Sequence, residues 1–192
     1  MVVEPIRDKK KIELMKKILR NGPFGERNHL LFVLGINSGL RISDLLKLKV
    51  SDVVDEKGKV RQHISVYEQK TGKYKKFPLG KAATAAIKEY LKAANPENTA
   101  PDRPLFPSRK GTGAISRVHA WEILSGAAKE AGVADQIGTH TLRKTFGYHA
   151  RKAGVGIEVI QTILNHSSPA VTMRYIGITQ DEIDDVYINL NL

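Results

Sequence analysis

The stretch THTLRKTFGYHARKAG, residues 139–154, places a histidine and an arginine in a basic helical pattern. Side chains three positions apart lie on the same face of a helix, so we expect His140 and Arg143 side by side. A guanidinium can bind two phosphate oxygens, and an imidazole can donate or shuttle a proton. The pair therefore suits a phosphate group, although this spacing alone is weakly specific.

A second stretch, LNHSSPAVTMRYIGIT at residues 164–179, also carries residues suited to chemistry. His166 precedes a Ser-Ser-Pro sequence, which is typical of a helix start. Tyr175 follows nine residues later, beyond a short predicted helix. Taken alone, the histidine is equally explained as a capping or buried residue, and the tyrosine as a core residue at a helix end.

Two earlier stretches complete the set. In NSGLRISDLLKLKV, residues 37–50, Arg41 follows a turn and Asp44 comes one helical turn later. An exposed ion pair is the default explanation there and contributes little to stability. In YEQKTGKYKKFPL, residues 67–79, Lys70 lies at the tip of a predicted hairpin that is rich in lysine and suited to phosphate contacts.

The rest of the chain predicts one domain of the α+β class, mainly α-helical with a small antiparallel sheet of about three strands within residues 50–79. Residues 95–113 are rich in proline and glycine and predict a surface loop inside that domain. Trp121 is expected to anchor the core. The predicted helices cover residues 9–20, 26–38, 42–48, 81–94, 116–131, 141–153, 157–164 and 169–175, and the clearest strands cover 62–67 and 74–79.

Composition narrows the class of protein. The 192 residues include no cysteine, which excludes disulfide frameworks, thiolate nucleophiles, zinc fingers and iron–sulfur clusters. No run approaches the about 18 to 20 apolar residues of a membrane helix, and the first residues lack a secretory signal. We therefore expect a cytoplasmic protein. The net charge of +11 indicates a polyanionic partner, and only 6% aromatic residues favour a DNA duplex over single strands.

The last residues differ from the rest. In TQDEIDDVYINLNL, residues 179–192, an apolar helical face is opposed by acidic side chains. This segment either packs on its own domain or on a neighbouring copy of the chain. Its apolar positions are Ile183, Val186, Tyr187 and Leu190.

Together, and in this order, the G-L-R-x-S-D-L-L stretch, the K-T-G-K hairpin, the H-x-L-R helix, the L-x-H-S-S turn and the following tyrosine resemble the catalytic domain of the tyrosine recombinase (phage integrase) family. The resemblance extends from about residue 9 to residue 175, nearly the whole chain. The ordered combination is far more specific than any one motif.

The resemblance implies a role for each residue. Tyr175 matches the nucleophile, and Asp44 matches an acidic position that supports the site. Arg41, Lys70, His140, Arg143 and His166 match the other catalytic positions. It also leads us to expect DNA contacts from Lys73, Lys75, Lys76 and Lys144.

The chemistry is consistent with these residue types. Two arginines and an imidazole can stabilise the charge that grows on a phosphodiester in the transition state, without a metal or other cofactor. A tyrosine hydroxyl has a pKa of about 10 and needs a proton acceptor, for which His140 is the candidate. Lys70 could protonate the departing 5′ oxygen. A 3′-phosphotyrosyl link would conserve the bond energy, so rejoining would require no ATP.

The resemblance also sets the expected organisation. We expect a catalytic domain over residues 1–179 and a tail over residues 180–192, without the helical core-binding domain that usually precedes the catalytic domain in this family. The tail is expected to couple protomers in a tetramer on double-stranded DNA. Two alternatives stay open: a non-cutting DNA-binding or architectural protein with the same fold, and a type IB topoisomerase-like strand transferase.

Overall fold

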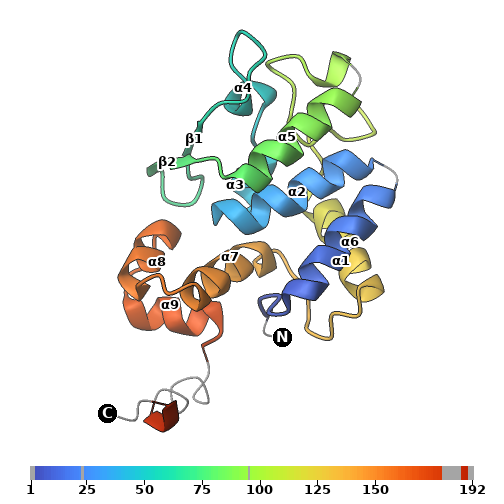
Figure 1. The fold of residues 1–192 in the computed structure, drawn as a ribbon. Coiled ribbons are helices and arrows are strands. Elements are labelled where there is room, and N and C mark those ends of the chain that lie inside the picture. Colours follow the sequence, from blue (N-terminus) through green and yellow to red (C-terminus); the bar gives the residue numbers. More distant parts are fainter. Residues whose placement is uncertain (1–2, 23, 95, 179–186, 190–192) are drawn as a thin grey trace.

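A computed structural model of the protein describes residues 3–22, 24–94, 96–178 and 187–189. Figure 1 shows the order of its elements along the chain. They are α1 (Lys9–Asn21), α2 (Gly25–Ser38), α3 (Ile42–Leu46), α4 (Val50–Val53), β1 (His63–Tyr67), β2 (Tyr74–Pro78), α5 (Lys81–Ala93), the 3₁₀ turn η1 (Pro96–Asn98), α6 (Arg117–Glu130), α7 (Thr141–Lys152), α8 (Ile157–Leu164) and α9 (Pro169–Ile176).

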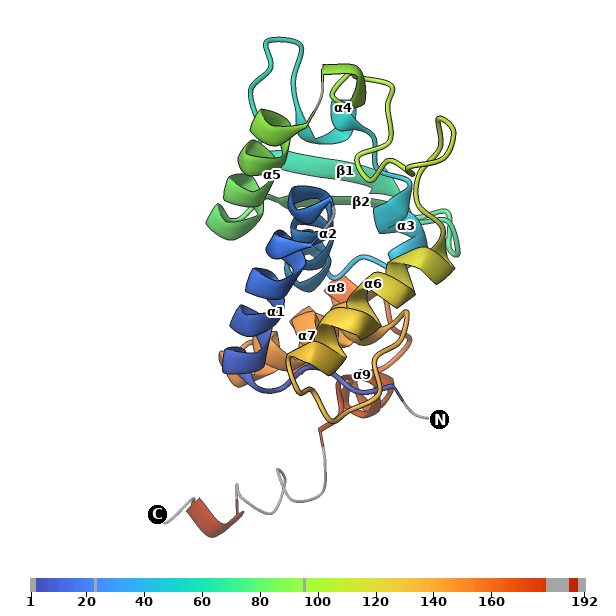
Figure 2. The ribbon, with the colours of Figure 1, turned by 90° about the vertical axis from the view of Figure 1, so that its right-hand side faces the viewer.

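Helix α2 lies at the centre of the fold. It is buried along most of its length because it packs against α1, α5 and α7, which surround it (Figures 1 and 2). A helix that is apolar around most of its circumference belongs in such a position. Its side chains join those of α1, α5 and α6 in the main hydrophobic core.

The end of α2 is fixed by a glycine. Gly39 has a φ of 61°, in the left-handed region that glycine adopts without steric cost. A Cβ atom at this position would also lie 2.9 Å from the ring of Phe146 on α7. The sharp turn directs the chain straight into Arg41 and α3.

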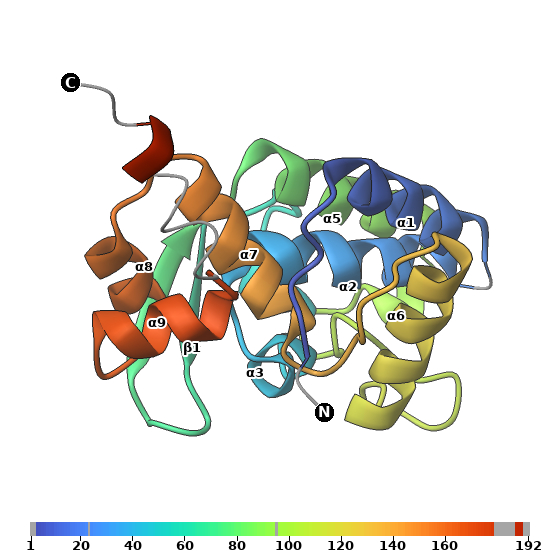
Figure 3. The same ribbon diagram turned by 90° about the horizontal axis from the view of Figure 1, so that it is seen from below.

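Helices α7, α8 and α9 form a second, smaller cluster at one end of the molecule (Figure 3). Its buried apolar side chains are Ile160, Leu164 and Ile176, with Phe146 and Tyr175 packed at its edge. Helix α7 also packs on α2, so it joins the two clusters.

The sheet is smaller than predicted. Strands β1 and β2 form an antiparallel pair in which Val66 faces Lys75 and Ser65 faces Lys76. The prediction of about three strands within residues 50–79 is wrong, because residues 50–53 form the short helix α4 instead. The Val54 amide donates to the Val50 carbonyl at 2.9 Å, which closes a helical turn, and Val54 pairs with Val60 only in an isolated bridge.

The predicted helices are confirmed to within a few residues at each end, and the described part of residues 95–113 is irregular apart from η1. Trp121 is an exception among the side chains: it stays 45% exposed while its indole N–H donates to the Ile137 carbonyl, so it is not a core anchor.

The predicted apolar face of the tail lies mostly outside the described residues; of its four positions only Tyr187 is described, and it is exposed. Among the described helices, none has the length and apolar character needed to cross a membrane.

Candidate active site

Arg41 stands at the N-terminus of α3, immediately after the turn that ends α2. The apolar residues on either side of it, Leu40 and Ile42, are buried in the main core and hold the backbone. Its guanidinium Nη1 lies 3.0 Å from Glu68 Oε1, and its side chain is only 16% exposed. The first predicted catalytic arginine is therefore held in place by a buried carboxylate.

Arg143 comes from the opposite side of the site, on α7. Its Nη1 donates to the Gly39 carbonyl and its Nη2 to the Leu164 carbonyl. Nη1 also lies 3.8 Å from Glu68 Oε1, and the side chain is 3% exposed. The two arginines thus come from separate clusters and meet at one carboxylate.

Tyr175 and His140, the predicted nucleophile and proton acceptor, lie side by side. His140 caps α7, Tyr175 lies near the end of α9, and the His140 Nδ1 is 3.2 Å from the Tyr175 hydroxyl. Burial, Arg143, Lys144 and more distant arginines all lower the pKa of His140, which favours the neutral imidazole. A neutral imidazole can accept the hydroxyl proton, as predicted for His140.

Two effects compete at the tyrosine hydroxyl. Burial raises the pKa of Tyr175, while Arg143 and Arg41 partly offset that rise. The hydroxyl therefore keeps its proton in the free protein, and ionisation requires an acceptor within reach. The Lys144 ammonium also lies 5.3 Å from the centre of the tyrosine ring, close enough for a cation–π contact.

His166 follows the C-terminus of α8 and packs on Tyr175. Its ring centre is 4.7 Å from that of Tyr175 in an edge-to-face arrangement, and its Nδ1 is 3.2 Å from the Thr172 hydroxyl. Burial, together with Arg143 and Arg41, lowers the pKa of His166 to about 4. The imidazole is neutral at pH 7 and can serve as a hydrogen-bond donor to a phosphate oxygen.

Lys70 is the predicted residue that the structure does not bring into the cluster. It is exposed in the turn between β1 and β2. The base of that turn is nevertheless anchored, because the Gln69 amide donates to Asp44 Oδ1 at 2.9 Å. Asp44 is 3% exposed, so it supports the hairpin from α3 rather than forming an exposed ion pair.

Glu68 is the residue that the sequence reasoning missed. It is 2% exposed, and besides contacting both arginines its Oε2 accepts hydrogen bonds from Asn165 Nδ2 and Thr71 Oγ1, each at 3.0 Å. Burial alone would raise the pKa of Glu68, but the hydrogen bonds from Asn165, Arg41 and Thr71 lower it overall. The only signal in the sequence is an acidic residue at the start of a basic hairpin.

The model of the phage integrase family matches residues 7–182 of this chain. The chain belongs to the phage integrase family. It is 44% identical over 186 residues to the probable integrase/recombinase YoeC of Bacillus subtilis, covering 97% of this chain and 96% of that protein. It is 33% identical over 168 residues to the tyrosine recombinase XerD of Listeria innocua, covering 86% of this chain but 54% of that protein.

Solved structures confirm the fold of this tyrosine recombinase. The XerA recombinase aligns with a TM-score of 0.76 at 20% identity over 100% of this chain and 65% of that one. A post-cleavage complex of the XerH recombinase with its difH substrate aligns with a TM-score of 0.74 at 22% identity over 94% and 50%. The bacteriophage HP1 integrase catalytic domain aligns with a TM-score of 0.59 at 21% identity over 98% and 96%.

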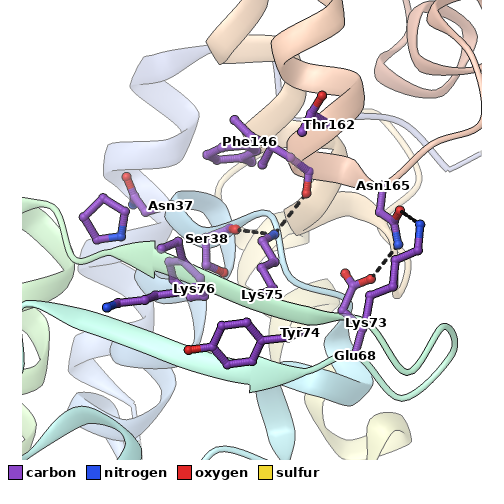
Figure 4. Close-up of a pocket in the computed structure, with 13 residues that line it drawn as sticks. Asn37, Ser38, Glu68, Lys73, Tyr74, Lys75, Lys76, Phe146, Thr162 and Asn165 are labelled. Carbon is purple, nitrogen blue, oxygen red and sulfur yellow. Dashed lines mark hydrogen bonds between the residues drawn. The ribbon is translucent and has the colours of Figure 1, made fainter.

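The four lysines predicted to contact DNA are differently placed in this integrase. Lys73 is exposed and donates to Asn165 Oδ1 at 3.0 Å, and Lys76 is exposed on β2. Lys144 is largely buried beside Tyr175. Lys75 points inward to the carbonyls of Ser38 and Ile163, as Figure 4 shows for Ser38.

Proposed function

We propose that this tyrosine recombinase cuts one strand of a DNA duplex with Tyr175 and rejoins it to another strand through a 3′-phosphotyrosyl intermediate. The observation that supports this most directly is the 3.2 Å separation between the Tyr175 hydroxyl and His140 Nδ1, beside the buried Arg143 and the partly buried Arg41. Membership of the family favours this activity over both a non-cutting DNA-binding role and a topoisomerase.

The proposed reaction uses each residue in one step. The Tyr175 oxygen attacks the phosphorus atom while its proton passes to His140. The bond to the 5′ oxygen breaks, and that oxygen takes a proton from Lys70 on the hairpin. In the reverse direction, a 5′ hydroxyl of another strand gives its proton to Lys70 and attacks the phosphotyrosine, and Tyr175 takes its proton back from His140. No metal or nucleotide enters this balance.

Arg41, Arg143 and His166 would stabilise the negative charge of the phosphate. A phosphodiester gathers negative charge on its non-bridging oxygens in the transition state, and donors already fixed in place stabilise it without reorganisation. The contact with Glu68 would hold the guanidinium groups of Arg41 and Arg143 close together before DNA arrives. Preorganisation of this kind is the main contribution that the fold makes to the proposed catalysis.

We further propose that residues 1–179 act as the catalytic domain on double-stranded DNA in the cytoplasm. The charge of +11 supports a DNA partner, with Lys73, Lys76 and Lys144 as contacts to phosphates. Residues 180–192 would pack on a neighbouring protomer in a tetramer. Their apolar positions at helical spacing support this, because such a face needs a partner.

Covalent trapping tests the proposed chemistry. The protein is mixed with a pool of nicked duplexes whose sequence around the nick is randomised, so that the short 5′-hydroxyl fragment diffuses away and the adduct persists. We expect the wild-type chain to form a protein–DNA adduct on a denaturing gel, and the recovered duplexes to define its preferred site. Tyr148→Phe, a change on α7 but outside the site, should form adducts like the wild type.

Two outcomes would contradict the proposal. Adducts from Tyr175→Phe would mean that another residue is the nucleophile. No adduct from the wild type, even with an added core-binding domain from a relative, would favour a non-cutting DNA-binding role. With a duplex in hand, exchange of strands between two labelled duplexes separates a recombinase from a topoisomerase, which would only relax supercoils.

Deletion of residues 180–192 tests the proposed role of the tail. We expect assembly of multi-protomer complexes on DNA to weaken more than binding of one protomer to one site, since the catalytic domain would stay intact. Gel-shift titrations resolve the two kinds of complex. An equal loss of both would overturn the assignment of the tail to assembly.

A further inference from the structure

The C-termini of α2 and α8 converge beneath the β-hairpin, and two cations bind their last carbonyls. The final carbonyls of a helix have no partner within the helix and need donors from elsewhere. Arg143, from α7, donates to the carbonyls of Gly39 and Leu164. One residue earlier in each segment, Lys75 Nζ from β2 donates to the Ser38 carbonyl at 3.3 Å and the Ile163 carbonyl at 3.1 Å.

Lys75 therefore repeats, from the hairpin, what Arg143 does from α7. A cation at a helix C-terminus is favoured because the carbonyl end of a helix carries partial negative charge. Lys75 meets two such ends at once. Figure 4 shows its side chain rising from β2 into the cavity of about 580 Å³ between the hairpin, the end of α2 and α8.

The segments joined by Lys75 lead directly to residues of the proposed site. Arg41 comes three residues after Ser38, and His166 comes three residues after Ile163. Lys70 lies on the same hairpin as Lys75, five residues earlier. One ammonium group thus connects the carrier of the proposed general acid to the two segments that carry phosphate-binding residues.

The charges around Lys75 belong to the same site. Arg143 of α7 and Arg41 at the start of α3 oppose its positive charge, while Glu68 at the end of β1 and Asp44 of α3 favour it. Burial is the largest influence, and together they lower the pKa of Lys75 to about 8. The ammonium is thus mostly charged at pH 7 and loses its proton as the pH rises through about 8.

We propose that Lys75 is a positioning residue for DNA cleavage: by binding the carbonyl ends of α2 and α8 it holds the Lys70 hairpin against the segments that carry Arg41 and His166. This rests on the cleavage reaction proposed above. It assigns to Lys75 a role different from that of Lys76, the next residue, which alternates to the outer, exposed side of the strand.

The test separates binding from cleavage in three variants: Lys75→Met, Lys75→Arg and Lys76→Met. On a nicked duplex recovered by trapping, we expect Lys75→Met to slow single-turnover adduct formation by about 10-fold or more while DNA affinity changes by less than about threefold. Lys75→Arg should recover most of the rate, because a guanidinium can donate to the same carbonyls. Lys76→Met should instead mainly weaken binding and reduce its salt dependence.

A pH profile adds a readout that a purely structural role would not change. The wild-type rate should fall as the pH rises through about 8, because a neutral amine makes weaker hydrogen bonds to the carbonyls than an ammonium does. Lys75→Arg should remove that fall, since arginine stays charged. Identical profiles for the two proteins, or a loss of affinity in Lys75→Met that matches the loss of rate, would overturn the proposal.

Hydrogen exchange keeps this test independent of the proposed function. In the free full-length chain, Lys75→Met should speed amide exchange across residues 67–77 and near Arg41, whereas Lys76→Met should not. Unchanged exchange in Lys75→Met would overturn the positioning role even if cleavage occurs. Failure of the wild type to form any adduct would instead reject the proposed cleavage reaction. The exchange result would still show whether Lys75 holds the hairpin against the ends of α2 and α8.

Discussion

The two hydrophobic clusters of this integrase differ sharply in how many buried apolar side chains they contain. The main core is built from α1, α2, α5 and α6 and includes side chains such as Leu34 and Phe32 that are fully buried. The cluster of α7, α8 and α9 rests on Ile160, Leu164 and Ile176 among the described residues. Regions with few buried apolar contacts open more easily than the rest of a fold.

The proposed active site is divided between these clusters. Arg41 and Asp44 belong to the main core side, whereas His140, Arg143, His166 and Tyr175 belong to the helices of the smaller cluster. A rigid part therefore holds one arginine, and a less stable part holds the proposed nucleophile and its proposed proton acceptor. Substitution of the residues that join the two parts should therefore reduce cleavage strongly, even where the side chain does not contact the phosphate.

Removal of the carboxylate that joins the two parts should have the largest effect. Glu68→Ala removes the carboxylate that Arg41 and Arg143 share, and it leaves Asn165 Nδ2 with only the longer hydrogen bond to Thr71 Oγ1. We expect cleavage to fall by at least about 100-fold and the free energy of unfolding to fall by about 3 to 5 kcal/mol, as when one partner of a buried ion pair is removed.

Single-turnover trapping and denaturant unfolding measure the two quantities for Glu68. Glu68→Gln is the matched control, because it can still accept from Asn165 and Thr71 but lacks the charge. Its losses should be intermediate. Wild-type cleavage by Glu68→Ala would show that the arginines are positioned without it.

Matched leucine truncations test whether the two clusters differ in local stability. Leu34→Ala in the main core and Leu164→Ala in the smaller cluster should each cost about 2 to 5 kcal/mol locally. We expect Leu34→Ala to lower the stability of the whole domain, and Leu164→Ala chiefly to increase amide exchange in α7, α8 and α9. Hydrogen exchange resolved by segment distinguishes them, and a uniform increase in both variants would mean that the clusters unfold as one unit.

A methyl group added at the contact between α2 and α7 tests how closely the two parts must fit. A Cβ on Gly35 would lie 2.4 Å from Leu142 Cδ1 and 3.2 Å from its Cβ and Cγ. Gly35→Ala should therefore cost about 1 to 3 kcal/mol by overpacking and should reduce cleavage by moving α7 away from Arg41. Thermal unfolding and trapping measure both effects.

Gly126→Ala is the control for that substitution. Gly126 lies within α6 and has open space where a Cβ would be. Alanine there should stabilise the chain by about 0.5 to 1 kcal/mol through helix propensity, without an effect on cleavage. A loss of stability in Gly126→Ala equal to that in Gly35→Ala would show that the loss does not come from the contact between α2 and α7.

Acid should weaken the smaller cluster slightly. Burial and the nearby arginines lower the pKa of His166 to about 4, so the unfolded chain binds a proton there before the folded chain does. Stability is therefore lost as the pH falls from about 6.5 toward about 4. His166→Gln should show a smaller decrease in Tm over this range, by about 2 to 4 °C.

Motif spacing allowed much of this arrangement to be predicted. Helix periodicity and capping residues placed the helices because both are local properties, and the order of the motifs indicated which side chains would meet. Glu68 was missed since its partners Arg41, Arg143 and Asn165 lie 27, 75 and 97 residues away, and no local pattern encodes such contacts.

The predictions of a third strand and of a buried Trp121 were wrong because hydrogen bonds decide both positions. About three strands were expected within residues 50–79, but the chain at Val50 forms a helical turn: the Lys49 amide donates to Asp52, and Val50 and Ser51 donate to carbonyls of the loop near residue 102. Trp121 was expected to anchor the core, yet its indole N–H needs an acceptor, which it finds in the Ile137 carbonyl while the side chain stays 45% exposed.

The contact between Tyr175 and His140 has a consequence for mixed assemblies. Both residues come from one chain and lie within hydrogen-bond reach, so in the proposed reaction each subunit would use its own Tyr175 as the nucleophile. Mixing Tyr175→Phe with Arg41→Ala should therefore not restore cleavage, because no subunit in the mixture would own a complete set. In an assembly on DNA, each inactive subunit would therefore remove one cleavage event, and each active subunit would still cleave its own strand.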